Sequence, residues 1–251
     1  MAQAAWPAWA VIFGGDDLKH FAVLNNWHKE QPRTRFEAAL EKSGLPYRIY
    51  QTNAGEFPDP SDVMGVFVGA SVAGAYDAEP WIAREHDVLK TLADAGVPML
   101  GLCFGSQILA SALVGCDQVF KRVTRETGFD EIQLSAEGRC DPLTKDLPPK
   151  LRTFMWHGDE VRADHPDIVI LADGTDCANH IWRWKHGLVW GLQPHPEMDQ
   201  DQICRFIEKN RDWFEREGKD ADALLRSPEP NDQLHVVFDR FFELVRQQDS
   251  L

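Results

Sequence analysis

Residues 98–107, Pro-Met-Leu-Gly-Leu-Cys-Phe-Gly-Ser-Gln, place a cysteine at a tight junction between a strand and a helix. The apolar run from Pro98 to Leu102 predicts a buried strand, and a helical pattern begins directly after Cys103. Gly101 and Gly105 flank the cysteine, where a larger side chain would obstruct a sharp turn and the approach of a substrate. The helix N-terminus favours a thiolate, because the helix dipole is positive at that end. The arrangement is the cysteine counterpart of the Gly-x-Ser-x-Gly nucleophile elbow.

A second motif, Gln-Pro-His-Pro-Glu at residues 193–197, supplies the base that a thiol nucleophile needs. Pro196 disfavours helical angles at His195 and has a fixed φ of its own, so His195 and Glu197 are held extended. Residues two apart in an extended segment point to the same side, which lets the carboxylate orient the imidazole. Alone, the motif is more typical of a surface turn without a catalytic role. Together with Cys103 it predicts a Cys-His-Glu triad.

The two motifs resemble the signatures of class I glutamine amidotransferases, Gly-x-Cys-x-Gly-x-Gln at Gly101–Gln107 and His-Pro-Glu at His195–Glu197. Residues 154–159, Phe-Met-Trp-His-Gly-Asp, are similar to a third landmark in the form found in the amidotransferase domain of GMP synthetase. The resemblance covers roughly residues 8–200. It implies acyl transfer to Cys103, proton transfer by His195 and orientation of His195 by Glu197.

The resemblance also implies an oxyanion hole and a substrate pocket. The segment after the strand at 64–68 matches the family's oxyanion loop, so the backbone N–H groups of Phe104, Gly69 and Ala70 are expected to bind the developing negative charge. His157 and Asp159 shape the pocket by family position. The expected substrate-binding residues are Ser71, Gln107, Trp156 and His157.

Three residues depart from the family pattern, namely Ala70, Ser106 and Trp156. Ala70 keeps its backbone N–H, so catalysis need not suffer. Ser106 and Trp156 bear on the identity of the substrate, and they favour a free-standing hydrolase that cleaves a γ-glutamyl amine or peptide. The amine portion stays open.

The alternative is a glutaminase subunit that delivers ammonia to a separate synthetase partner, since the chain lacks the Ser-Gly-Gly-x-Asp motif of an ATP-binding domain. The complete triad disfavours a catalytically silent binding module.

The charge balance narrows the range of partners. With 26 basic and 40 acidic residues the net charge is −14, which argues against nucleic-acid binding. No apolar run approaches a membrane span and no secretion signal is readable, so the cytoplasm is expected. Five cysteines without a close pair predict neither a disulfide framework nor a zinc site. No cofactor or metal is expected, and His180 and His186 are interpreted as packing or surface residues.

The pattern along the chain predicts an α/β fold, a central, mostly parallel sheet flanked by helices on both faces. The family resemblance implies the flavodoxin-like class I amidotransferase version of this fold. Helices are expected at 33–42 and 81–95. Residues 14–32 are expected to form a long loop containing His20, Trp27 and His28, either a lid or a surface excursion. Strands are expected at 9–13, 47–50, 64–68, 99–102, 119–123, 131–134, 153–156, 168–171, 181–185 and 189–192.

The C-terminal part is expected to add helices at 200–217 and 231–248, the second with Asn231 as its N-cap. An apolar stripe on that helix favours core packing over a partner surface; it consists of Val237, Phe238, Phe241, Phe242 and Val245. We therefore expect one domain over residues 1–251, with a core at about 8–200 and a helical extension at about 200–251.

Overall fold

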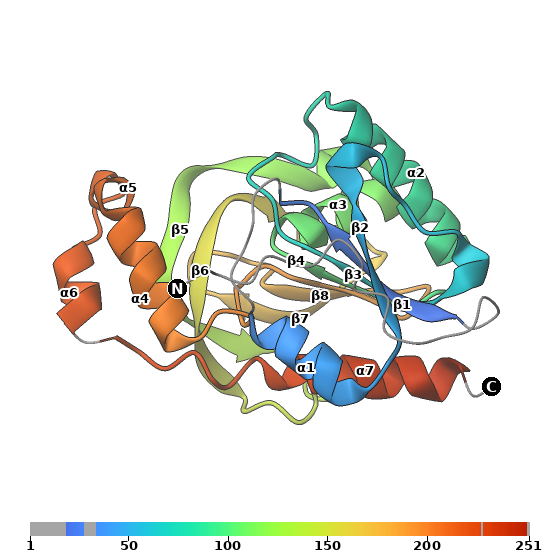
Figure 1. Cartoon of the computed structure of the whole chain (residues 1–251). Coiled ribbons are helices and arrows are strands. Elements are labelled where there is room, and N and C mark those ends of the chain that lie inside the picture. Colours follow the sequence, from blue (N-terminus) through green and yellow to red (C-terminus); the bar gives the residue numbers. More distant parts are fainter. Residues whose placement is uncertain (1–18, 28–33, 227, 250–251) are drawn as a thin grey trace, which may run out of the picture.

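The strands of this protein form one mixed sheet in the order β2-β1-β3-β4-β9-β8-β7-β5-β6 (Figure 1). The computed structural model describes residues 19–27, 34–226 and 228–249. The first five strands in this order run parallel, and the last four pair antiparallel. The strands are β1 His20–Asn25, β2 Tyr47–Gln51, β3 Val63–Val68, β4 Met99–Leu102, β5 Val119–Leu134, β6 Lys150–Val161, β7 Ile168–Gly174, β8 Ile181–Trp184 and β9 Val189–Leu192.

Helices cover both faces of the parallel part, with α1 and α7 on one face and α2 and α3 on the other (Figure 1). The smaller helices α4, α5 and α6 pack beside β6 at the antiparallel end. Among the described residues, no helix combines the length and apolar character needed to cross a bilayer. The helices are α1 Arg35–Ser43, α2 Pro80–Asp94, α3 Phe104–Leu113, α4 Gln200–Lys209, α5 Arg211–Arg216, α6 Ala221–Arg226 and α7 Val236–Asp249, with 3-10 turns at Thr52–Ala54, Pro60–Asp62 and Cys116–Gln118.

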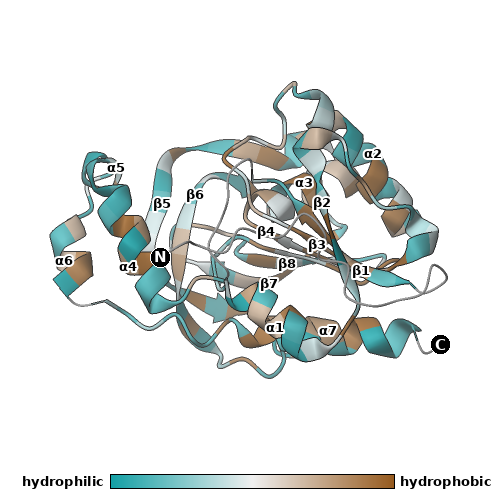
Figure 2. Ribbon diagram, viewed as in Figure 1, coloured by the Kyte–Doolittle hydropathy of each residue, from teal (hydrophilic) through white to brown (hydrophobic). Residues whose placement is uncertain are grey.

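The predicted apolar stripe of the last helix is core packing, as expected. Phe238, Phe241 and Phe242 are fully buried, and Phe242 meets the ring of Phe21 on β1 edge-on at 5.3 Å. Figure 2 shows that the central strands are largely apolar, whereas the helices that cover the sheet carry both apolar and polar stretches. Because α7 fills one face of the sheet next to α1, the C-terminal helix is part of the core and not an appendage to it.

Two sequence expectations about the first part of the chain fare differently. The expected strand at 9–13 lies outside the described residues. The expected loop at 14–32 is wrong over residues 20–25, which form β1 between β2 and β3. Its apolar segment from Phe21 to Leu24 is buried on both faces, as is usual for a central parallel strand. The apolar run at residues 21–24 is short and has strongly polar residues on both sides, so the sequence pattern resembled that of a loop.

Two boundaries also differ from expectation. The pieces at 119–123 and 131–134 belong to one long strand, β5, whose pairing with β6 is interrupted by a register shift between Lys121 and Glu126. The expected helix at 200–217 is divided at Asn210 into α4 and α5. The predicted helices near 33–42 and 81–95 are confirmed as α1 and α2.

The topology brings the two catalytic motifs to one edge of the sheet. Strands β4 and β9 are parallel neighbours, with Gly101 opposite Gly191 and Leu102 opposite Leu192. Cys103 follows β4 directly, and His195 follows β9. Both therefore emerge at the carboxyl ends of adjacent strands, the usual position of ligand sites in open α/β sheets.

Candidate active site

Cys103 occupies a strained turn between β4 and α3. The backbone of Cys103 has φ 51° and ψ −107°. Among the described residues, Cys103 is the only one besides glycines with a positive φ. Such a conformation costs on the order of 1–3 kcal/mol and persists where the surroundings enforce it. The N–H of Cys103 donates to the carbonyl of Leu192 on β9 at 2.7 Å, which ties the turn to the neighbouring strand. The thiol lies at the start of α3, and Cys103 is 7% exposed.

The two flanking glycines are required by contacts across this turn. A Cβ atom on Gly101 would lie 2.4 Å from the carbonyl oxygen of Gly105. A Cβ atom on Gly105 would lie 2.0 Å from the carbonyl oxygen of Val68 on β3. Neither contact can be relieved by rotating a flexible side chain, because the opposing atoms belong to the backbone. The glycines therefore let α3 pack directly against the sheet and hold Cys103 at its edge.

His195 and Glu197 form the predicted hydrogen-bonded pair. The expected extended conformation is wrong, because residues 196 and 197 lie in a turn where the N–H of Met198 donates to the carbonyl of His195 at 3.4 Å. Nδ1 of His195 lies 2.8 Å from Oε1 of Glu197, and both side chains are largely buried. This bond leaves Nε2 of the imidazole without a hydrogen-bond partner among the described residues, while the Cys103 thiol faces the carbonyl of Trp156 at 4.0 Å. His195 and Cys103 are close enough for their charges to interact. Burial alone would lower the pKa of His195, but the charges of Glu197 and Cys103 outweigh it and raise that pKa well above its ordinary value. The site therefore favours the imidazolium form of His195.

Asn231 holds the turn that carries His195. Its Nδ2 donates to the carbonyls of His195 at 2.8 Å and Met198 at 2.9 Å. Its Oδ1 accepts from the hydroxyl of Thr153 and from the N–H of Phe154 on β6. The expected N-cap role of Asn231 is wrong, because α7 begins five residues later and the side chain is buried. Sequence reasoning missed this residue, since an asparagine just after two prolines resembles a helix start.

The oxyanion loop offers fewer donors than expected. The N–H of Gly69 donates to the carbonyl of Leu24 at 3.0 Å, so it is already used within the sheet. Phe104, the first residue of α3, and Ala70, which lines the pocket, remain as the candidate donors. The Gly69 carbonyl is in turn held by the side chain of Asn26 at 3.2 Å, which fixes the loop from below.

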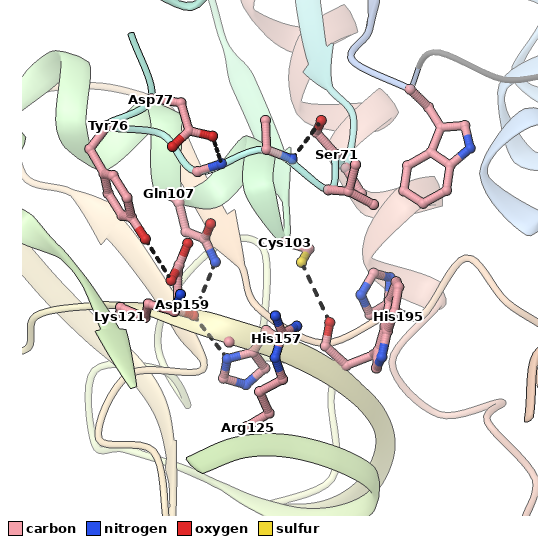
Figure 3. Close-up of a pocket in the computed structure, with 17 residues that line it drawn as sticks. Ser71, Tyr76, Asp77, Cys103, Gln107, Lys121, Arg125, His157, Asp159 and His195 are labelled. Atoms are coloured by element: carbon pink, nitrogen blue, oxygen red, sulfur yellow. Dashed lines mark hydrogen bonds between the residues drawn. The ribbon is translucent and has the colours of Figure 1, made fainter. Parts of the chain in front are cut away.

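A cavity of about 360 Å³ opens in front of Cys103, within the size range of small-molecule sites (Figure 3). Figure 3 shows the thiol facing this cavity between Ser71 and His195. Trp156 and Trp27 contribute apolar surface to its wall. Trp27 is the one residue of the expected lid loop that the structure brings to the site; His20 lies on β1, and His28 falls outside the described residues.

The expected substrate-binding residues all line this cavity, but the side chains of three of them already form hydrogen bonds within the protein. Nε2 of Gln107 donates to the Asp159 carbonyl at 3.0 Å and to Oε1 of Gln193 at 3.2 Å, which leaves its own oxygen facing the cavity wall. His157 is buried and hydrogen-bonded through both ring nitrogens. Ser71 accepts from the N–H of Ala73.

Ser106 does not face the substrate pocket. Its hydroxyl accepts a hydrogen bond from Nε1 of Trp182 at 2.8 Å, below the sheet and next to Gly191, where a Cβ atom would collide with both side chains. The departure of Ser106 from the family pattern therefore bears on packing beneath the cysteine turn. The sequence-based use of this residue as a substrate indicator is wrong.

The cavity lining also includes two cationic side chains that the sequence analysis did not identify. Lys121 pairs with Asp159 in the register of β5 with β6, and Arg125 lies within the shifted stretch between Lys121 and Glu126 (Figure 3). Neither forms an ion pair with another described residue, and the Arg125 guanidinium stacks over the ring of Trp213 at 5.0 Å. The hydroxyl of Tyr76 donates to Asp159 at 3.0 Å across the same wall.

Comparison with known proteins places this site in a family. The model of the family described as "Glutamine amidotransferase class-I" matches residues 35–210. The chain belongs to this family.

Proteins named "GMP synthase [glutamine-hydrolyzing]" are among its relatives. The one from Cronobacter sakazakii is 31% identical over 161 residues, covering 62% of this chain and 28% of the relative. The one from Edwardsiella ictaluri is 35% identical over 123 residues, covering 45% and 23%. The chain thus spans less than a third of the length of these relatives.

Solved structures match this amidotransferase chain over most of its length. A glutamine amidotransferase from Thermotoga maritima superposes with a TM-score of 0.75 at 22% identity, covering 92% of this chain and 99% of the other. A glutamine amidotransferase from Methylobacillus flagellatus gives a TM-score of 0.70 at 19% identity, covering 93% and 95%. At these identities the match establishes the fold alone.

Proposed function

We propose that this amidotransferase-family chain is a cysteine-dependent amidohydrolase that cleaves the γ-glutamyl amide bond of a γ-glutamyl amine or peptide through a γ-glutamyl thioester. The observation that carries the chemistry is the elbow thiol of Cys103 in the same cavity as the hydrogen-bonded His195–Glu197 pair. A reduced thiol is needed, which favours a cytoplasmic location. All five cysteines are free in the structure.

In the first half-reaction the Cys103 thiolate attacks the γ-carbonyl carbon, and the carbonyl π electrons move onto oxygen. The N–H groups of Phe104 and Ala70 stabilise that oxyanion; removing one such donor typically costs about 3–4 kcal/mol of transition-state binding. Collapse of the tetrahedral intermediate breaks the C–N bond, while the His195 imidazolium protonates the departing amine. The products are the free amine and a γ-glutamyl thioester on Cys103.

In the second half-reaction His195, now neutral, removes a proton from water as that water attacks the thioester carbonyl. The second tetrahedral intermediate expels the Cys103 thiolate and releases glutamate. Glu197 accepts the Nδ1 hydrogen bond throughout, which keeps Nε2 directed at the reacting atoms and stabilises the imidazolium.

Lys121 and Arg125 support a substrate that carries a carboxylate. Both line the cavity, and the nearby carboxylate of Asp159, with which their charges interact, also accepts a hydrogen bond from Tyr76. A γ-glutamyl peptide has carboxylates on its glutamyl and amine portions, whereas a γ-glutamyl alkylamine has the glutamyl carboxylate alone. The register shift in β5 and the stacking on Trp213 hold Arg125 in place, so its ordering costs less on binding.

The test is a comparison of kcat/KM for the purified protein on glutamine, a γ-glutamyl alkylamine and a γ-glutamyl dipeptide. We expect the dipeptide to be best, and Arg125→Gln to reduce the dipeptide's advantage by about 10-fold or more, as loss of a charged hydrogen bond does. Lys145→Gln, at an exposed position remote from the cavity lining, is the matched control and should change nothing. Glutamine as the best substrate would reject the hydrolase proposal.

A glutaminase subunit that serves a separate synthetase is the second candidate, and one observation favours it. Two exposed large apolar side chains, Val72 and Tyr76, line the cavity, and exposed Val123 stands between its two cations in the sequence. A docked partner would cover such a surface. This candidate predicts feeble hydrolysis of every substrate by the chain alone and strong stimulation of glutamine hydrolysis by an ATP-dependent synthetase.

A further inference from the structure

A second cluster of reactive side chains lies behind the wall of the substrate cavity. Glu126 on β5, His157 on β6, and Cys177 and His180 from the connection between β7 and β8 are all buried. One ligand atom from each residue, two imidazole nitrogens, a sulfur and a carboxylate oxygen, lies within 4.8 Å of all the others. The proposed hydrolysis has no role for Glu126, Cys177 or His180.

The hydrogen bonds of His157 show that this cluster is incomplete as it stands. Nδ1 of His157 lies 2.9 Å from the carbonyl oxygen of Asp159, which can accept a hydrogen bond but not donate one. Nδ1 must therefore carry the proton, and Nε2 of the neutral ring presents a lone pair. That lone pair faces Oε2 of Glu126 at 2.8 Å. Two acceptors at this distance require a cation between them, either a proton or a metal ion.

His180 gives an independent indication. Its side chain is fully buried, yet neither ring nitrogen has a hydrogen-bond partner. Nε2 points into the cluster, 3.4 Å from Oε1 of Glu126, and this oxygen also lacks a hydrogen bond. Buried polar atoms nearly always have a hydrogen-bond partner. Two unpaired atoms that face each other, Nε2 of His180 and Oε1 of Glu126, therefore indicate a missing ligand. The nearby cation Arg122 already pairs with the carboxylate of Glu160.

We propose that Glu126, His157, Cys177 and His180 bind a zinc ion. The mixed set of imidazole, thiolate and carboxylate donors suits this metal, and four protein ligands close its tetrahedral shell, as in structural sites. Nε2 of His157 is aimed inward by the bond from Nδ1 to a backbone carbonyl, the outer-shell arrangement usual for a metal-binding imidazole. Binding displaces the thiol proton of Cys177 to solvent.

The ligands would move only slightly to bind the ion. Bonds of about 2.0–2.3 Å place tetrahedral ligands about 3.3–3.8 Å apart, so the closest pair must open and the widest must close by on the order of 1 Å. The ion would fasten the β7–β8 connection to β5 and β6. Because β6 continues through Trp156, whose carbonyl lies 4.0 Å from the Cys103 sulfur, the site would stiffen one wall of the cavity.

The test is the metal content of untagged protein produced with zinc in the medium and then dialysed. We expect about one zinc ion per chain in the wild type, and its loss in Cys177→Ser and in His180→Gln. Cys140→Ser, which changes an exposed cysteine, and His186→Gln, which changes an exposed histidine on the neighbouring hairpin, are matched controls and should keep the metal.

A measurement on the wild-type chain alone guards against variants that fail to fold. Protein stripped with a chelator is refilled with Zn²⁺, which should raise its Tm, or with Co²⁺, which should give the absorption bands of a thiolate-bound tetrahedral ion. If the wild type retains no zinc and neither ion binds on refilling, a proton bridges Glu126 and His157 and the zinc site is rejected. Zinc content in Cys177→Ser equal to that of the wild type would also reject it.

Discussion

Replacing Glu85 by Gln should stabilise this protein by an amount that grows as the pH rises. Glu85 is fully buried on α2, where its Oε1 accepts a hydrogen bond from Nδ2 of Asn26 at 3.0 Å. Nδ2 of Asn26 also donates to the carbonyl of Gly69 in the oxyanion loop, and Oδ1 of Asn26 accepts from the hydroxyl of Thr52. Burial raises the pKa of Glu85 to about 8, while the Asn26 bond lowers it by less.

The magnitude follows from this shift. The ordinary pKa of 4.5 applies in the unfolded chain, so between pH 4.5 and about 8 the folded state binds a proton that the unfolded state has lost. Folding stability is therefore highest below pH 4.5 and falls as the pH rises through this window. At 1.36 kcal/mol per pH unit the loss reaches about 3 kcal/mol at pH 7. A glutamine keeps an acceptor for Asn26 without a charge to bury.

The assay is urea unfolding of the wild type and Glu85→Gln at pH values from 4.5 to 8. We expect the two free energies of unfolding to lie close together at pH 4.5, and the variant to be about 3 kcal/mol more stable at pH 7. Asp87→Asn, at an exposed position of the same helix, is the matched control and should not reproduce the gain of about 3 kcal/mol at pH 7. The reasoning fails if the advantage of Glu85→Gln is also independent of pH, because Glu85 would then ionise freely in the folded protein.

The remaining predictions concern His195 and the turn that carries it. Glu197→Gln should reduce turnover less than His195→Ala does, because an amide still orients the ring, and kinetics on one γ-glutamyl substrate compare the two. Without the Glu197 charge the pKa of His195 falls, so the alkaline limb of the kcat–pH profile should move to lower pH; an unmoved limb would contradict the assignment of His195 as the acid. Asn231→Ala removes four buried hydrogen bonds and should cost about 2–4 kcal/mol in unfolding and lower kcat, whereas Asn210→Ala, which removes one side-chain bond, should cost at most about 1 kcal/mol.

The elbow and the His-Pro-Glu motif could be predicted from the sequence because their geometry depends on neighbouring residues. Gly101 and Gly105 admit the tight turn, and the short spacing keeps His195 and Glu197 within reach of each other, although the chain forms a turn at residues 196–197 and not the expected extended segment. The adjacency of the two motifs required the strand order, which alternating strands and helices predict in outline. The pairing of β4 with β9 confirms that they share an edge.

Other features could not be predicted because they depend on contacts between distant segments. Asn231 bonds residues that are 36 and 77 positions away in the chain. The Gly69 N–H is not available to the oxyanion hole because β1 lies beside β3, and β1 itself was hidden by its polar flanks. The proposed zinc ligands come from three separate segments, and the one close pair, Cys177 and His180, is completed by Glu126 and His157 only in the fold.

The central claim is that Cys103 is the nucleophile of a γ-glutamyl amidohydrolase, and covalent trapping tests it most directly. A glutamine-derived chloroketone should inactivate the protein, and peptide mass spectrometry should find the label on Cys103 alone among the five cysteines. Cys103→Ala should lose the label and at least about 10³-fold in turnover. Inactivation with Cys103 unmodified and the label on Cys116, Cys140, Cys177 or Cys204 would contradict the account.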